Sequence, residues 1–235
     1  MNIVITGASK GFGKSIAEIF ASDKQGHTLL LCSRNRETLE AEGKQLQGRF
    51  PRATIKTKTC DVSKRGELVE FGKWVLGQVA KIDILINNAG QFIPGSIHDE
   101  EDGVLEKMIE TNLYSAYHLT RLLLPRMIEQ KGGQIYNICS IASLNAYKNG
   151  GAYSISKFAL AGFSKNLREE MKPHGIRVTA VYPGAAFTDS WAGSGISPDR
   201  IMESADIAKL IYGAAHLSSK ACVEDIIVRP QLGDL

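Results

Sequence analysis

Tyr153 and Lys157 stand four positions apart, and they are the residues in this chain best suited to moving a proton. On a helix this spacing puts both side chains on one face, so the lysine ammonium can lie beside the phenol. Because a nearby cation favours phenolate, we expect Lys157 to lower the Tyr153 pKa from about 10. Ser140 lies upstream at the end of an apolar run. With a Gly-rich turn near the N-terminus, these residues indicate a reduction site, although for the pair alone an exposed Tyr and Lys on one helix face is the alternative.

The Gly-rich turn follows a short apolar strand, Asn2–Thr6, and precedes a helical pattern. It reads Gly7-Ala8-Ser9-Lys10-Gly11-Phe12-Gly13. A strand, a Gly turn and a helix N-terminus present backbone N–H groups and the positive end of the helix dipole to a diphosphate. The alternative is a tight turn without a ligand.

Composition limits the class of protein. With 235 residues and 43% apolar content, we expect a single domain over residues 1–235. A formal charge of +3 with scattered basic residues argues against nucleic-acid or anionic-membrane partners. The cysteines (Cys32, Cys60, Cys139 and Cys222) are far apart with no metal-ligand spacing, so we expect reduced thiols, no metal and a cytoplasmic protein. No apolar run approaches the roughly 18 residues of a membrane span.

Strand-like runs alternate with amphipathic helical stretches along the chain. After Asn2–Thr6 they are Thr28–Cys32, Ala53–Thr59, Ile82–Asn87, Gln134–Cys139, Arg177–Tyr182 and Val223–Val228. This alternation predicts an α/β fold, a doubly wound parallel sheet with helices on both faces. The least patterned region, residues 185–204, is either a mobile lid or an ordinary surface loop.

From end to end the chain resembles the short-chain dehydrogenase/reductase family. The matching residues are Thr6 to Gly13, Asp61-Val62, Asn87 to Gly90, Asn112, Ser140, Tyr153 with Lys157, and Pro183-Gly184 with Thr188. The resemblance implies a Rossmann-type sheet of about seven parallel strands that binds a dinucleotide.

The resemblance also implies catalytic roles. Tyr153 would protonate the substrate oxygen as hydride arrives from the nicotinamide, and would act as base in the reverse direction. Ser140 would polarise the carbonyl by a hydrogen bond. Lys157 would bind the nicotinamide ribose and keep the Tyr153 pKa low. Asn112 would anchor a water of a proton relay, although an Asn that interrupts a helix is the simpler interpretation.

Cofactor contacts are implied in the same way. Gly7, Ser9, Lys10, Gly11, Phe12 and Gly13 would hold the diphosphate, Asp61 and Val62 the adenine, Asn88, Ala89 and Gly90 the adenosine side, and Pro183, Gly184 and Thr188 the carboxamide. After the second strand the chain has Ser33-Arg34 where an NAD enzyme would place an acid. Arg34 and Lys10 suit a 2′-phosphate, so we expect NADP(H) in preference to NAD(H).

Features of the C-terminal part bear on the substrate. The segment from Val223 to Leu235 resembles the ending of bacterial sepiapterin reductase-like and benzil (diketone) reductase-like members. Trp191, Phe187 and Tyr147 are candidates for an apolar wall beside Ser140, and a buried Trp191 that holds its own loop down is the alternative for that residue. We expect reduction of a small carbonyl compound, either a pterin side-chain carbonyl or a 1,2-diketone.

Several alternatives remain open. They are reduction of a 3-oxoacyl thioester or another ketone, a nucleotide-sugar epimerase or dehydratase, and a non-catalytic dinucleotide sensor. The helical stretches Asn112–Gln130 and Ala152–Met171 are apolar on more than one face, and with the resemblance they imply a homodimer or homotetramer.

Overall fold

A single parallel sheet forms the centre of the molecule. The computed structural model describes residues 1–188, 195 and 197–234. The sheet has seven strands in the order β3-β2-β1-β4-β5-β6-β9, and every pairing is parallel. The strands are β1 (Asn2–Thr6), β2 (Thr28–Ser33), β3 (Thr54–Thr59), β4 (Ile84–Asn87), β5 (Gly133–Ile138), β6 (Ile176–Pro183) and β9 (Asp225–Val228).

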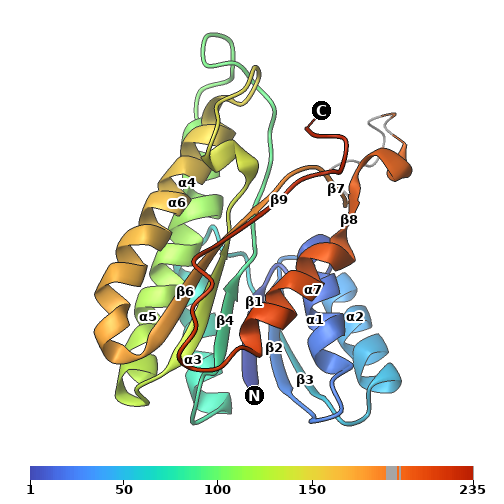
Figure 1. Ribbon diagram of the computed structural model, residues 1–235, viewed down its shortest axis with the longest axis vertical. Helices are drawn as coiled ribbons and strands as arrows, with labels where there is room; N and C mark the ends of the chain where they lie inside the picture. Colours follow the sequence, from blue (N-terminus) through green and yellow to red (C-terminus); the bar gives the residue numbers. More distant parts are fainter. Residues whose placement is uncertain (189–194, 196, 235) are drawn as a thin grey trace.

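Helices cover both faces of this sheet (Figure 1). One layer contains α1 (Gly11–Ala21), α2 (Arg36–Arg49) and α7 (Ser204–Ala215). The other contains α3 (Arg65–Gln78), α4 (Val104–Ile109), α5 (Ser115–Glu129) and α6 (Gly151–Met171). The strand order reverses beside β1, as in a Rossmann-type doubly wound sheet.

The strands are apolar on both sides because each side packs against a helix layer. In β2, Leu29 and Leu31 enter the core under α1, α2 and α7, whereas Leu30 and Cys32 enter the opposite core. Successive strand residues point to opposite faces, so a central strand covered on both faces needs apolar side chains at every position. The predicted strands are confirmed to within about two residues at each end.

The ends of the 185–204 region are held together. A short strand pair, β7 (Ala186–Phe187) with β8 (Met202–Glu203), joins the two ends of this region. The Met202 amide also donates to the Ala185 carbonyl at 3.1 Å. Trp191 lies outside the described residues, so its predicted place in the apolar wall stays a prediction.

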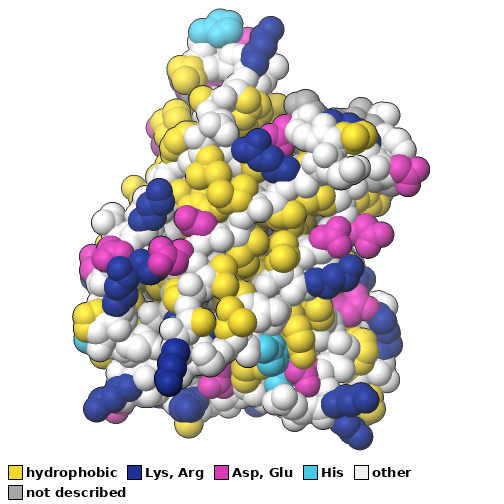
Figure 2. Space-filling model, viewed as in Figure 1, with side chains coloured by type: hydrophobic (Ala, Val, Ile, Leu, Met, Phe, Trp, Pro, Cys, Tyr) yellow, Lys and Arg dark blue, Asp and Glu magenta, His cyan; other side chains and the backbone are white. Residues whose placement is uncertain are grey.

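Hydrophobic side chains also gather on the outer surface, in a band across β9 and α7 (Figure 2). Exposed hydrophobic residues of these elements include Leu210 on α7 and Ile227 on β9, and Leu217 follows α7. All four cysteines are free thiols, three of them buried and Cys222 exposed. Within the described part of the chain, no helix is both long enough and apolar enough to cross a bilayer.

Candidate active site

Most of the predicted site residues lie at the carboxyl ends of the strands, or in the segments that follow them. Ser33 and Arg34 end or follow β2, Asn88 follows β4, Ser140 follows β5 and Pro183 ends β6. In an open α/β sheet these ends form the ligand crevice, beside the position where the strand order reverses.

The Gly-rich turn joins β1 to α1 in a conformation that needs glycine. Gly11 has φ +54°, and a Cβ there would lie 3.5 Å from the Thr188 methyl group, so the turn faces the segment after β6. A Cβ on Gly13 would lie 2.3 Å from the Gly7 carbonyl oxygen. Any larger residue at position 13 would therefore displace the turn.

Asn88 fixes this turn to the neighbouring strand. Its Nδ2 donates to the carbonyls of Thr6 at 2.9 Å and Gly7 at 3.1 Å, and the Thr6 hydroxyl accepts from the amides of Asn88 and Ala89, both at 3.0 Å. The predicted adenosine segment is thus bonded to the predicted diphosphate turn, which leaves Gly90 exposed in front of them.

The remaining predicted cofactor residues, Asp61, Val62 and Arg34, differ in the contacts that they make within the protein. The Asp61 carboxylate accepts from the Ser63 hydroxyl at 2.8 Å, and Val62 packs into the core below α3. Arg36 pairs with Glu40 at 2.7 Å, whereas exposed Arg34 has no ion pair among the described residues.

Ser140 is oriented by the short 3₁₀ helix Ile141–Ser143 that follows it. Its Oγ accepts the Ala142 amide at 3.1 Å, and the Ser143 hydroxyl accepts the Ser140 amide at 3.2 Å. This capping box uses one lone pair of the Ser140 oxygen and leaves its O–H free to donate to another group.

Tyr153 and Lys157 lie one turn apart in α6, as their spacing predicts. The Tyr153 ring packs edge-on against Phe92, with centroids 4.9 Å apart. Lys157 is buried, its Nζ donates to the Ile138 carbonyl at 2.8 Å, and it lies 5.9 Å from the Tyr153 ring centroid.

Burial dominates the ionisation of both groups. Removal from water raises the Tyr153 pKa to about 12, against an opposing hydrogen bond with Ser140, and lowers the Lys157 pKa to about 8. The prediction that Lys157 lowers the Tyr153 pKa is therefore wrong: burial raises this pKa, and the Lys157 ammonium, which donates to the Ile138 carbonyl, is not among the groups that shift it. Tyr153 remains a protonated phenol at neutral pH.

Asn112 lies in a single π-helical turn, Glu110–Tyr114, between α4 and α5. Its side chain is buried and makes four contacts, of which three are short: Oδ1 accepts the Gln91 amide at 2.7 Å, and Nδ2 donates to the Gln91 carbonyl at 3.0 Å and to the Ser156 hydroxyl at 2.9 Å. Isolated π turns often occur at functional sites. Here Asn112 joins the segment after β4 to α6, beside Lys157.

A cavity of about 560 Å³ opens in front of Ser140 and Tyr153. Seven predicted residues line it: Phe12, Ser140, Tyr147, Tyr153, Pro183, Gly184 and Thr188. Residues that were not predicted complete the wall, namely Phe92, Cys139, Ile141, Ala142, Asn145, Ala146, Ala185, Ala186 and Asp234. Phe187 is half-exposed and lies outside this lining.

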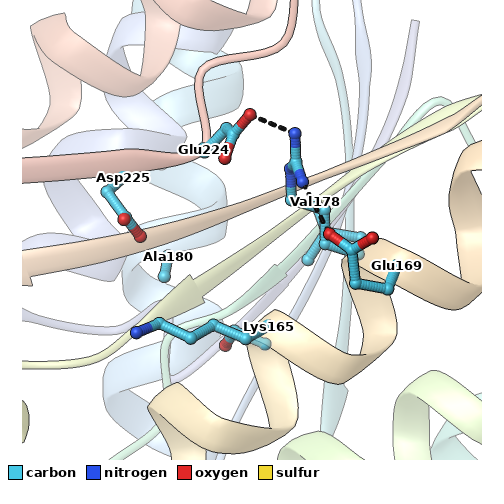
Figure 3. A pocket seen from close by; sticks show the side chains of 8 residues that line it. Lys165, Glu169, Val178, Ala180, Glu224 and Asp225 are labelled. Carbon is cyan, nitrogen blue, oxygen red and sulfur yellow. Dashed lines mark hydrogen bonds and ion pairs between the residues drawn. The ribbon is translucent and has the colours of Figure 1, made fainter.

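A second, smaller cavity of about 240 Å³ lies away from this site, between α6, β6 and β9 (Figure 3). Glu224 and Glu169, labelled in Figure 3, both form ion pairs with the Arg168 guanidinium. Together these three groups carry a formal charge of −1, and none of the predicted catalytic residues lines this cavity.

Comparisons with known proteins agree with the fold. The family model for short chain dehydrogenases matches residues 1–196. This chain belongs to the short-chain dehydrogenase family.

Related proteins in this family match nearly the whole chain. A sepiapterin reductase of Chlorobaculum tepidum is 32% identical over 99% of this chain and 97% of its own. An uncharacterized oxidoreductase of Staphylococcus saprophyticus is 31% identical over 97% and 96%. Among solved structures, a metagenomic short-chain oxidoreductase in complex with NADP is 30% identical, with a TM-score of 0.84 and coverage of 98% and 97%. The protein is thus an oxidoreductase of the short-chain dehydrogenase family.

The residues present fit a dinucleotide. A Cβ on Gly90 would lie 3.4 Å from Lys157 Nζ and 3.3 Å from Asn112 Oδ1, so glycine keeps the approach to these polar atoms open. Backbone N–H groups at the start of α1, a lysine ammonium and a serine hydroxyl are donors of the kind that diphosphate and ribose groups need. The individual contacts stay predictions.

Proposed function

We propose that this protein is an NADPH-dependent carbonyl reductase acting on a pterin side-chain carbonyl or a 1,2-diketone. The observation that carries the proposal is the cavity, in which the Ser140 hydroxyl and the Tyr153 phenol face a mostly apolar wall with one carboxylate, Asp234, among the described lining residues. The similarity of this chain to a sepiapterin reductase supports a flat, partly polar substrate.

In the proposed mechanism the chain's own residues act on the substrate oxygen. When bound, the reduced nicotinamide supplies a hydride. Ser140 donates a hydrogen bond to the carbonyl oxygen, and Tyr153, protonated because its pKa is about 12, gives its proton to the same oxygen. Lys157 supplies a cation beside the phenolate that results, and Asn112 holds the surrounding loop in place.

The proposed preference for NADP(H) depends on Arg34. It is exposed directly after β2, and this position holds no acidic residue that would repel a 2′-phosphate. Fold alone does not decide the cofactor, since a 7α-hydroxysteroid dehydrogenase of similar fold is complexed with NADH (27% identity, TM-score 0.87, coverage of 99% and 94%). The proposed preference for NADP(H) therefore rests on the charge of Arg34 at this position.

Replacing Arg34 with serine should raise the KM for NADPH about 10- to 100-fold and leave the KM for NADH nearly unchanged, because only the former loses a charge-assisted phosphate contact. Steady-state kinetics with both cofactors measure this. Arg36→Ser is the matched control, since Arg36 is already paired with Glu40. An equal change for both cofactors would contradict the assignment of Arg34 to the phosphate.

Asp234 should distinguish the two proposed substrate classes. Its carboxylate lines the cavity and is held by Arg229 at 2.8 Å. A pterin ring has N–H donors that a carboxylate can bind, whereas benzil has none. Asp234→Asn should lower kcat/KM for sepiapterin about 10- to 100-fold and that for benzil less than about threefold. Equal losses for both substrates would argue against a pterin anchored by Asp234.

The direct test is NADPH oxidation with sepiapterin, benzil, other vicinal diketones and an acetoacetyl thioester. Turnover of the first two classes supports the proposal. Turnover of the thioester alone would favour the alternative 3-oxoacyl reductase. Nucleotide binding without turnover of any compound would favour the alternative dinucleotide sensor.

We also propose a cytoplasmic homodimer or homotetramer. Tyr114 in the π turn and Ile155 and Phe158 on α6 are exposed on the helices predicted to meet another subunit, and the band across β9 and α7 offers a second apolar surface. Both surfaces suit burial against a copy of the chain, and the free thiols agree with a reducing compartment. A monomeric mass in sedimentation equilibrium would contradict the assembly.

A further inference from the structure

Three metal-ligating side chains meet at the amino-terminal end of the sheet, opposite the candidate active site. Asp23 follows α1, His27 immediately precedes β2, and His216 caps the C-terminus of α7. One ligand atom from each lies within 4.8 Å of the other two. Sequence spacing predicted no metal site, because these residues come from opposite ends of the chain.

The hydrogen bond of His216 determines which of its ring nitrogens is free. Nδ1 lies 2.8 Å from the Tyr212 carbonyl oxygen, which can only accept, so Nδ1 carries the hydrogen. In a neutral ring, Nε2 then presents a lone pair towards Asp23 Oδ2, 3.5 Å away. These two acceptor atoms repel each other. A cation placed between them would be attracted to both.

His27 completes the arrangement from the buried side. Its Nε2 lies 3.1 Å from the same Asp23 Oδ2, and its Nδ1 lies 3.2 Å from the Met1 nitrogen. The ring is 2% exposed and cannot swing away into solvent. A single carboxylate oxygen therefore lies close to the Nε2 atoms of two fixed imidazoles.

We infer that Asp23 Oδ2, His27 Nε2 and His216 Nε2 form a binding site for zinc or a similar divalent transition metal ion. Zinc bonds of about 2.0–2.1 Å place neighbouring ligands of a tetrahedron about 3.3–3.4 Å apart. The observed 3.1 and 3.5 Å lie on either side of that value. On binding, the proton of His27 Nε2 leaves to solvent and the Met1 ammonium, 3.2 Å from Nδ1, passes one proton to Nδ1, so the ring stays neutral and Nδ1–H donates to the Met1 amine that results. A water can take the fourth position beside the partly exposed His216.

Neighbouring groups orient the ligands. The Tyr212 hydroxyl donates to Asp23 Oδ2 at 2.7 Å, and the Gln25 amide donates to the other carboxylate oxygen at 2.9 Å. These bonds lower the Asp23 pKa to about 2, so the carboxylate is ionised. The Tyr212 ring packs on His216 with centroids 4.1 Å apart. Such partners around the ligands commonly support metal sites.

The bound ion would have a structural role. It would join the turn between α1 and β2 to the end of α7. The helices α1 and α7 lie side by side (Figure 1). Because the site lies at the amino ends of the strands, it is remote from Ser140 and Tyr153. Metal binding should therefore change thermal stability without changing turnover.

The experiment is a zinc titration of the untagged full-length protein after EDTA treatment and buffer exchange, in competition with a chromophoric chelator. We expect one zinc ion per chain and a higher Tm with zinc. His216→Gln should weaken zinc binding at least about tenfold and abolish the Tm increase. His98→Gln is the matched control, since His98 is exposed and outside the cluster, and it should behave as wild type.

Cobalt(II) provides a second measurement. Intense visible bands typical of tetrahedral coordination should appear with wild type and His98→Gln, and not with His216→Gln. Absence of zinc binding by wild type would overturn the inference. Equal zinc binding by His216→Gln and wild type would also overturn it, because the metal would then lie elsewhere.

Discussion

Replacing Tyr153 with phenylalanine is expected to lower kcat for carbonyl reduction by about 10²- to 10⁴-fold, the usual range for loss of a general acid. The dissociation constant for NADPH should change less than about threefold, because phenylalanine keeps the ring contact with Phe92. Steady-state kinetics and a fluorescence titration with NADPH measure the two quantities separately.

Tyr114→Phe is the control for Tyr153→Phe. Tyr114 is exposed and lies outside the lining of the cavity, so its variant should retain wild-type kcat. Unchanged turnover in Tyr153→Phe would remove Tyr153 as the proton donor. Because the Tyr153 pKa is raised to about 12, its phenol should not limit reduction below about pH 11, whereas the reverse oxidation, which needs phenolate, should accelerate as pH rises.

The fold could be predicted from the sequence because its signals are local. The apolar runs of β1, β2 and β4 and the glycines between β1 and α1 follow from backbone geometry and burial on both faces of a sheet. The order of the strands also places the predicted residues at the carboxyl-terminal end of the sheet. The grouping of Ser140, Tyr153 and Lys157 therefore followed from the sequence together with the family resemblance.

What could not be predicted depends on contacts between distant segments. Phe92 and Asp234 enter the cavity from loops whose paths no periodic pattern defines. The raised Tyr153 pKa depends on how completely the folded chain excludes water, whereas the spacing of Tyr153 and Lys157 reported only their proximity. The hydrogen bond of Lys157 to the Ile138 carbonyl, which directs the ammonium, likewise forms only when α6 packs on β5.

The buried Lys157 ammonium should make the wild-type protein less stable than a variant without this charge. Burial lowers its pKa from the usual 10.5 to about 8, a penalty of about 3 kcal/mol for the charged form at neutral pH. Between pH 8 and 10.5 the unfolded chain binds more protons at this lysine than the native state does. The contribution of Lys157 to stability therefore rises with pH through this window, and the full penalty applies below it.

Lys157→Met should consequently be about 1–2 kcal/mol more stable than wild type at pH 7, after loss of the hydrogen bond to the Ile138 carbonyl is subtracted. The advantage should shrink as pH rises towards 10.5, while kcat falls at least about 100-fold. Urea unfolding at pH 7 and pH 10 measures the difference. Lys165→Met, an exposed lysine on the same helix, should change stability little at either pH. Equal unfolding midpoints for wild type and Lys157→Met at pH 7 would show that the ammonium is not penalised, whereas greater stability with lost activity would mean that the chain retains a destabilising charge because the reaction requires it.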